Sequence, residues 1–139
     1  MLNSYYTEKL LGLQEVSIKK VNDTKENYEI FIEQPRKQCV CPVCGKLTDK
    51  VHDYRTQRIK ELSAFEKPVV LVLRKRRYAC SCGKHFAEPN SFLPKYQRMT
   101  QRTILALIDR LRDCRSYSSV AREFRLSVPT VIRFFRNVR

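Results

Sequence analysis

The sequence lacks any long apolar run and any recognisable export signal. An uninterrupted apolar stretch such as Val69 to Leu73 is far shorter than the ~20 residues that a membrane-spanning helix requires. The N-terminus, MLNSYYTEKLLGLQ, has neither the cationic start nor the apolar stretch of a secretory signal. We therefore expect a cytoplasmic chain with no membrane partner. Its six cysteines are then expected to be thiolate ligands or free thiols rather than disulfides.

Acidic residues are also scarce, with 14 Asp and Glu against 28 Lys and Arg and a formal net charge of +14. Residues 1–34 hold 4 basic and 6 acidic side chains, so the positive excess lies wholly in the remainder of the chain. All ten basic residues after position 95 are Arg, which suits bidentate contacts with phosphate and guanine. This distribution favours a nucleic-acid partner over a merely solvated surface. No convincing nucleophile–base pair or acidic cluster is present, so we expect no enzyme activity in this chain.

Two short cysteine turns predict a metal site. Cys41 and Cys44 form a Cys-x-x-Cys turn followed by Gly45, and Cys80 and Cys82 form a tighter Cys-x-Cys turn. Zinc prefers four such ligands in a tetrahedron, so we predict a zinc ribbon held by these four sulfurs. The second pair is one residue shorter than usual, so Cys39 and His85 remain alternatives to Cys82 as the fourth ligand. Buried free thiols are the competing interpretation, and a redox pair at Cys41 and Cys44 is less favoured.

The hydrophobic pattern predicts an α+β chain, a small β-rich zinc-ribbon unit followed by an all-α helix-turn-helix unit. A short helix is expected over residues 5–12, two strands between Val16 and Glu33, and further strands over 51–62 and 69–78. A linker rich in proline lies near residues 89–94. Helices are expected from Thr100 to about Cys114, then over 117–124 and 128–137. The expected units are residues 1–36, packing with the ribbon as a helix and hairpin, the zinc ribbon at 37–90, and the helical unit at 96–139.

The segment from 117 to 136 has the pattern of a helix-turn-helix. Val120, Ala121 and Phe124 are expected to face inward, and Ser127 is a good N-cap for the second helix. Arg125 departs from the pattern because it occupies the turn position where glycine is common. The residues expected to face DNA from the second helix are Ser127, Thr130, Arg133, Arg136 and Asn137, with Arg133 the best candidate for guanine.

The basic run Arg74-Lys75-Arg76-Arg77 precedes the second cysteine turn. On a strand these side chains alternate between faces, so half of them can meet one partner. They are either a charged edge strand or a strip that contacts phosphate. We favour phosphate contacts from Arg74 and Arg76, with Arg55, Arg58 and Lys60 on the neighbouring strand.

The ordered motifs resemble the N-terminal region of bacterial insertion-sequence transposases of the ISL-three group. The matching stretches are Leu10 to Val16, the CPxCG turn at 41–45, His52 to Leu62, Pro68 to Cys80, Phe86-Ala87-Glu88, and Ser116 to Val131. The resemblance implies a zinc ribbon and helix-turn-helix that bind the terminal inverted repeats in double-stranded DNA during DNA transposition. It places the catalytic domain, a DDE-type nuclease in that family, after Arg139.

Three interpretations follow for the partner. The first is a transposase DNA-binding region associated with the nucleoid, in which a homodimer is left open. The second is a stand-alone DNA-binding regulator. The third is an RNA- or ribosome-associated zinc-ribbon protein, which the basic strand suits but the arginine-bearing helix does not.

Overall fold

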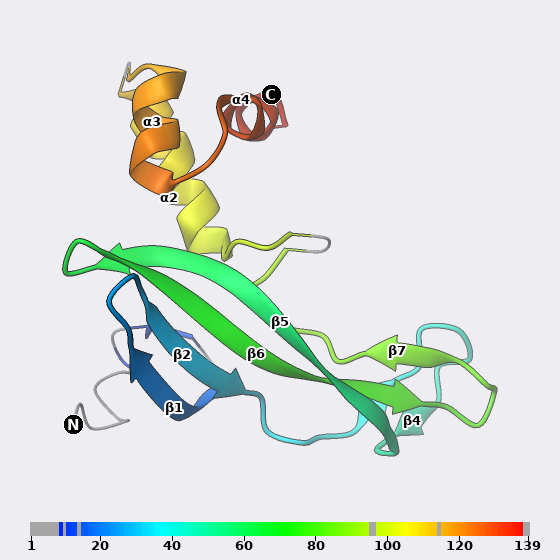
Figure 1. Cartoon of the computed structure of the whole chain (residues 1–139). Helices are drawn as coiled ribbons and strands as arrows, with labels where there is room; N and C mark the ends of the chain where they lie inside the picture. The colour runs from blue at the N-terminus through cyan, green and yellow to red at the C-terminus, as the bar shows by residue number, and fades with distance from the viewer. Residues whose placement is uncertain (1–8, 10, 14, 95–96, 114, 138–139) are drawn as a thin grey trace.

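The computed structural model describes residues 9, 11–13, 15–94, 97–113 and 115–137. The predicted helix over residues 5–12 falls largely outside the described residues, and Cys114 lies outside them altogether. The described chain forms a β-rich part followed by three helices, which gather beside one end of the long strands (Figure 1). This order confirms the predicted α+β class. No described helix has the length and apolar character needed to cross a membrane.

One long hairpin, β5 (Val51–Ala64) and β6 (Lys67–Ala79), forms one side of the main sheet, with β5 at the edge. A shorter hairpin, β1 (Ser17–Asp23) and β2 (Tyr28–Glu33), joins it because β2 pairs in parallel with β6, giving the order β1-β2-β6-β5. Strand β7 (His85–Ala87) pairs with the last residues of β6, while β3 (Cys39–Val40) and β4 (Leu47–Thr48) form a separate small sheet. The N-terminal hairpin and the strands that carry the second cysteine turn thus belong to one sheet.

Alternate residues of these strands build an apolar core on one face of the sheet. Ile30 and Ile59 both lie opposite Leu71 in the register, so the three side chains share that face. Leu11 and Phe92 pack on them from segments before and after the sheet. The buried members of this core are Leu11, Ile30, Ile32, Ile59, Val69, Leu71, Leu73 and Phe92.

The helices are α2 (Gln101–Arg112), α3 (Tyr117–Phe124) and α4 (Val128–Arg136). Each begins at a hydroxyl N-cap, Thr100, Ser116 and Ser127, whose side chain accepts a hydrogen bond from the backbone three residues on. The helix bounds, and the cap at Ser127, confirm the sequence prediction to within one or two residues. The helices enclose a second core of Met99, Leu107, Ile108, Leu111, Val120, Ala121, Val131 and Phe134.

A buried carboxylate attaches the helices to the sheet. Glu61 of β5 is 4% exposed, and its Oε1 accepts hydrogen bonds from the hydroxyls of Thr100 and Thr103, both at 3.1 Å. The same oxygen accepts from Arg102 Nε at 2.9 Å. A buried charge is stable only when it is paired and hydrogen-bonded, so this carboxylate determines where α2 begins on the sheet. The sequence patterns did not identify this interaction.

Candidate metal centre and nucleic-acid interface

The two cysteine turns have the same backbone design despite their different lengths. In the first, Cys41 N–H donates to Lys46 O at 2.9 Å and Gly45 N–H donates to Cys41 O at 3.0 Å. In the second, Cys80 N–H donates to Lys84 O at 2.9 Å and Gly83 N–H donates to Cys80 O at 3.0 Å. Gly45 and Gly83 have φ of 75° and 89°, a conformation that glycine adopts without strain. The shorter Cys-x-Cys turn is therefore closed by equivalent hydrogen bonds.

The turns bring the sulfurs of Cys41, Cys44, Cys80 and Cys82 within 4.8 Å of one another. The Sγ atoms of Cys41 and Cys82 are 3.7 Å apart, and those of Cys44 and Cys80 are 3.3 Å apart. Zn–S bonds of about 2.3 Å in a tetrahedron place sulfurs about 3.8 Å apart. The four thiols are thus placed for a zinc ion in a closed structural site.

Hydrogen bonds within the cluster already favour ionisation of two of these thiols. The backbone N–H of Cys82, followed by the thiol of Cys44, lowers the pKa of Cys80 to about 6. The backbone N–H of Cys44 lowers the pKa of Cys41. For Cys44 the N–H of Lys46 acts in the same direction, but the thiol of Cys80 and burial outweigh it and raise the pKa to about 11. Zinc binds the thiolate form of cysteine. Cys80 and Cys41 are therefore the two ligands that lose their proton to zinc most easily.

The two alternative ligands lie outside this cluster. Cys39 is buried on β3, and its sulfur lies 3.8 Å from Lys37 O. The ring of His85 stacks on that of His52 with centroids 3.9 Å apart. Among the described residues the geometry groups Cys82, and neither alternative, with the other three sulfurs.

Helices α3 and α4 are joined by a tight turn at Arg125. This residue is left-handed, with φ of 53° and ψ of 50°, and its N–H reaches back to the carbonyls of Ala121 and Arg122. A side chain in this conformation costs about 1 kcal/mol. Leu126 N–H then donates to Ala121 O at 2.9 Å, which ends α3 and turns the chain into α4. Buried Val120 and Val131 pack across the two helices.

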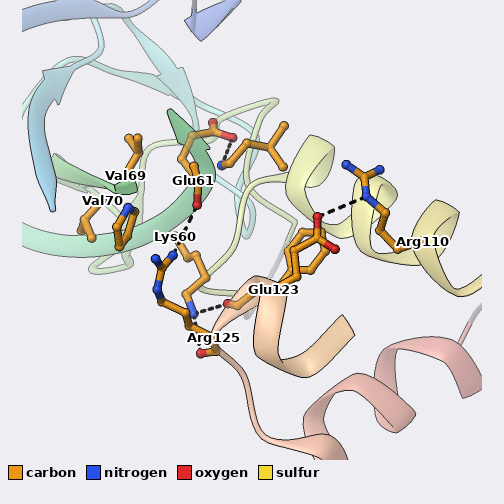
Figure 2. A pocket seen from close by; sticks show the side chains of 11 residues that line it. Lys60, Glu61, Val69, Val70, Arg110, Glu123 and Arg125 are labelled. Atoms are coloured by element: carbon orange, nitrogen blue, oxygen red, sulfur yellow. Dashed lines mark hydrogen bonds and ion pairs between the residues drawn. The ribbon is translucent and has the colours of Figure 1, made fainter. Parts of the chain in front are cut away.

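Lys60 of β5 holds this turn against the sheet, at the edge of a cleft of about 250 Å³ (Figure 2). Its ammonium group donates to the carbonyl oxygens of Phe124 at 2.9 Å and Arg125 at 3.0 Å. Arg125 in turn donates from Nη1 to Ser63 Oγ at 3.4 Å. Burial, and secondly the charge of Arg125, lower the pKa of Lys60. Lys60 lies on the strand where it was expected, but its charge is engaged by the carbonyl end of α3 rather than directed at a free surface.

The outer face of α4 is basic and accessible. Arg133 and Arg136 are exposed, and neither forms an ion pair with a described residue. The Arg133 guanidinium lies 5.7 Å from the centre of the Phe134 ring, while Phe134 itself is buried in the helical core. The remaining residues predicted to face DNA are Ser127 and Asn137, which are exposed, and Thr130, which is half-buried.

A second basic surface lies on the sheet, in a groove of about 550 Å³. Arg55 opposes Lys75 across the hairpin, and Arg98 approaches from the segment before α2. Arg77 also lines the groove but is paired with Asp53 at 2.9 Å. Arg58 lines it too, although Glu29 lies 3.1 Å away. Lys75 and Arg98 were missed in the sequence. The alternation of the basic run indicates only that Lys75 shares a face with Arg77, and the register then places Arg55 opposite Lys75.

The prediction that Arg76 contacts phosphate is wrong. Its side chain is buried, with the guanidinium 2.6 Å from Glu33 and 3.4 Å from Glu88. Nη1 also donates to Gln34 O. Arg76 therefore links β2, β6 and the segment after β7 inside the protein. Its neighbour Arg74 is exposed, with its guanidinium 3.8 Å from the centre of the Tyr54 ring.

Comparisons with known proteins find two families, which match successive parts of the chain. Residues 30–83 match the family described as the zinc-finger of transposase IS204/IS1001/IS1096/IS1165, and residues 88–138 match the helix-turn-helix domain of transposase family ISL3. The transposase for insertion sequence element IS1001 of Bordetella parapertussis is 32% identical over 135 residues, which cover 94% of this chain and 33% of that protein. The chain thus spans about a third of the length of this curated relative. No solved structure matches it.

Proposed function

Because the chain belongs to the ISL3 family of insertion-sequence transposases, we propose that it is a region that binds double-stranded DNA through α4. The observation that carries this proposal is the outer face of α4, where Arg133 and Arg136 are exposed and free of carboxylates among the described residues. Helix α4 lies on a core of Val131 and Phe134, so its outer face is held rigidly. A helix presented in this way fits the major groove of DNA.

Within the groove the residues of α4 take different roles. Ser127 and Thr130 lie in the first turn, where hydroxyls and backbone N–H groups meet phosphate or base edges. Arg133 is one turn further along the helix. Its guanidinium can donate two hydrogen bonds to a guanine, one to O6 and one to N7. Arg136 and Asn137 extend the contact towards the end of the helix.

In this proposal the sheet contacts DNA phosphates, and these contacts do not depend on the base sequence of the DNA. Arg55, Lys75 and Arg98 line one groove, and a duplex backbone is a polyanion that such a group of cations attracts. Arg58 and Arg74 are available for weaker contacts, because Glu29 lies beside Arg58, and Glu33 and the Tyr54 ring lie beside Arg74. These phosphate contacts would fix the register of the protein while α4 reads the bases.

Zinc has a structural role in this proposal. Cys41, Cys44, Cys80 and Cys82 would hold the ion with no open coordination position, so it joins the two cysteine turns without taking part in chemistry. The closed turns support the end of β6 and β7, on which Lys75 and Ala87 line the basic groove. The metal centre thus shapes one of the two DNA-contacting surfaces.

We further infer that the DNA bound is the terminal inverted repeat of an insertion sequence, because the IS1001 relative is a transposase for such an element. A gel-shift experiment with the zinc-loaded chain tests this. It compares the terminal repeat of the element that encodes the chain with a scrambled duplex and a structured RNA. We expect the terminal repeat to bind most tightly at physiological salt.

The alternatives predict different outcomes in the same experiment. Tightest binding to the RNA would favour a ribosome- or RNA-associated protein. Equal affinity for all three nucleic acids would contradict sequence-specific binding. Tight binding to a duplex unrelated to the repeat would favour a stand-alone regulator.

A further inference from the structure

The outer face of α4 carries an apolar residue that the helical core does not use. Ile132 is half-exposed, and it is absent from the residues that pack on that core, although Val131 and Phe134 on either side belong to it. An isoleucine on a basic, solvent-facing surface gains nothing from water. Its exposed part is available to an apolar group of a partner.

Ile132 lies in a shallow hollow of about 360 Å³ on this face. Pro129 is three residues before it and Arg136 four residues after it, so all three lie on one side of the helix. Arg133 and Asn137 complete the lining. The hollow therefore has two apolar side chains, flanked by two guanidinium groups.

The chemistry of base edges identifies what such a hollow accepts. In the major groove, guanine, cytosine and adenine present hydrogen-bonding groups, and only thymine adds an apolar group, its 5-methyl. Guanidinium groups beside the hollow suit guanine or phosphate next to that methyl. A side chain with no donor or acceptor, such as Ile132 or Pro129, discriminates among bases only through this methyl group.

We propose that Ile132, with Pro129, binds the 5-methyl group of a thymine in the DNA site and so determines part of its sequence. This inference rests on the proposed function, since it requires α4 to lie in the major groove. It adds a specificity-determining pair to the arginines already assigned to that helix.

The experiment begins by selecting preferred duplexes from a random library with the zinc-loaded chain. Each thymine of the selected site is then replaced singly by uracil, which removes only the methyl group. We expect one or two positions to lose about fourfold in affinity, the fold-change that corresponds to one buried methyl. Ile132→Ala is expected to lose a similar factor on the thymine duplex and to become indifferent to uracil at those positions.

Two further variants keep the result interpretable. Pro129→Ala removes the second apolar wall and is expected to weaken the response to uracil without abolishing it. Leu105→Ala removes an exposed leucine from α2, away from α4, and is expected to respond to uracil as the wild type does. Circular dichroism melting checks that each variant is folded.

The possible failures are distinguishable. A chain that enriches no duplex overturns the proposed function and this inference with it. A selected duplex whose affinity is unchanged by every uracil, or a site without thymine, overturns the inference alone. It is also overturned if folded Ile132→Ala keeps the full response to uracil.

Discussion

The ammonium nitrogen of Lys60 lies 3.0 Å from the carbonyl oxygen of Arg125, although the two residues are 65 positions apart in the chain. Lys60 comes from the last third of β5, near the hairpin turn, and Arg125 is the left-handed residue between α3 and α4. The same ammonium group donates a hydrogen bond to the carbonyl of Phe124. The sheet therefore stabilises the turn that precedes α4, and Lys60 links the sheet to the helix proposed to read DNA.

Replacing Lys60 by methionine is expected to destabilise the protein while keeping most of the side-chain volume. Lys60→Met removes both hydrogen bonds to the end of α3, and we expect a loss of about 1–3 kcal/mol in the free energy of unfolding. Urea denaturation of the zinc-loaded chain measures it. The control is Lys19→Met, an exposed lysine on β1. Equal stabilities of the two variants would show that the interaction with α3 contributes nothing.

Zinc content is expected to depend on Cys82 and not on Cys39. Elemental analysis of the purified chain is expected to give about one zinc per chain, the stoichiometry of a four-thiolate site. Cys82→Ser removes one ligand of the cluster, so we expect less than half of the wild-type zinc. Cys39→Ser leaves the four clustered sulfurs intact and is expected to keep it. A loss of zinc in Cys39→Ser would contradict the ligand set.

Arg133→Ala is expected to relax the sequence preference of DNA binding. Removing a bidentate interaction with guanine costs about 1–3 kcal/mol on the preferred duplex and much less on a scrambled one. The ratio of the two affinities, measured by fluorescence anisotropy, reports this difference. Arg112→Ala removes an exposed arginine of α2 and serves as the control for charge. An unchanged ratio in Arg133→Ala would exclude this residue as a base-reading side chain.

Arg76→Met is expected to affect folding rather than DNA binding. The substitution leaves Glu33 and Glu88 without their buried cation, which typically costs about 3–5 kcal/mol. Arg74→Met, one alternation away on the same strand, removes an exposed charge that lies over the Tyr54 ring and 3.9 Å from Glu33, and is expected to cost only about 1 kcal/mol or less. Thermal unfolding of both variants compares them. A stable Arg76→Met chain would refute the structural role given to this arginine.

Features set by local sequence were predictable here. The cysteine turns depend on a few adjacent residues, and each helix begins at a hydroxyl cap followed by a periodic apolar stripe. For the same reason the exposed arginines of α4 were identified from their spacing.

Features that depend on distant segments were not predictable. The run Arg74-Lys75-Arg76-Arg77 shows that neighbours alternate, but only the parallel pairing of β2 with β6 places Glu33 beside Arg76. Glu61 and Lys60 have no local motif, because their partners lie about 40 and 65 residues away. From the sequence alone, a charged residue whose partner is remote in the chain cannot be distinguished from a charged residue that binds a ligand.

The basic groove of the sheet is expected to control the salt dependence of binding. Arg98→Ala or Lys75→Ala removes one cation from the groove, and the absence of one phosphate interaction is expected to flatten the slope of log affinity against log salt by about 0.9. Because phosphate contacts carry no base information, the ratio of preferred to scrambled affinity is expected to stay constant.

The slope is obtained from affinities measured between about 50 and 200 mM salt. Several phosphate interactions together change the affinity by about 10³-fold over this range. Lys19→Ala, on the exposed strand β1, lowers the net charge equally and is expected to leave the slope unchanged. If all three variants shift the slope alike, the effect comes from overall charge, and the groove is not a phosphate site.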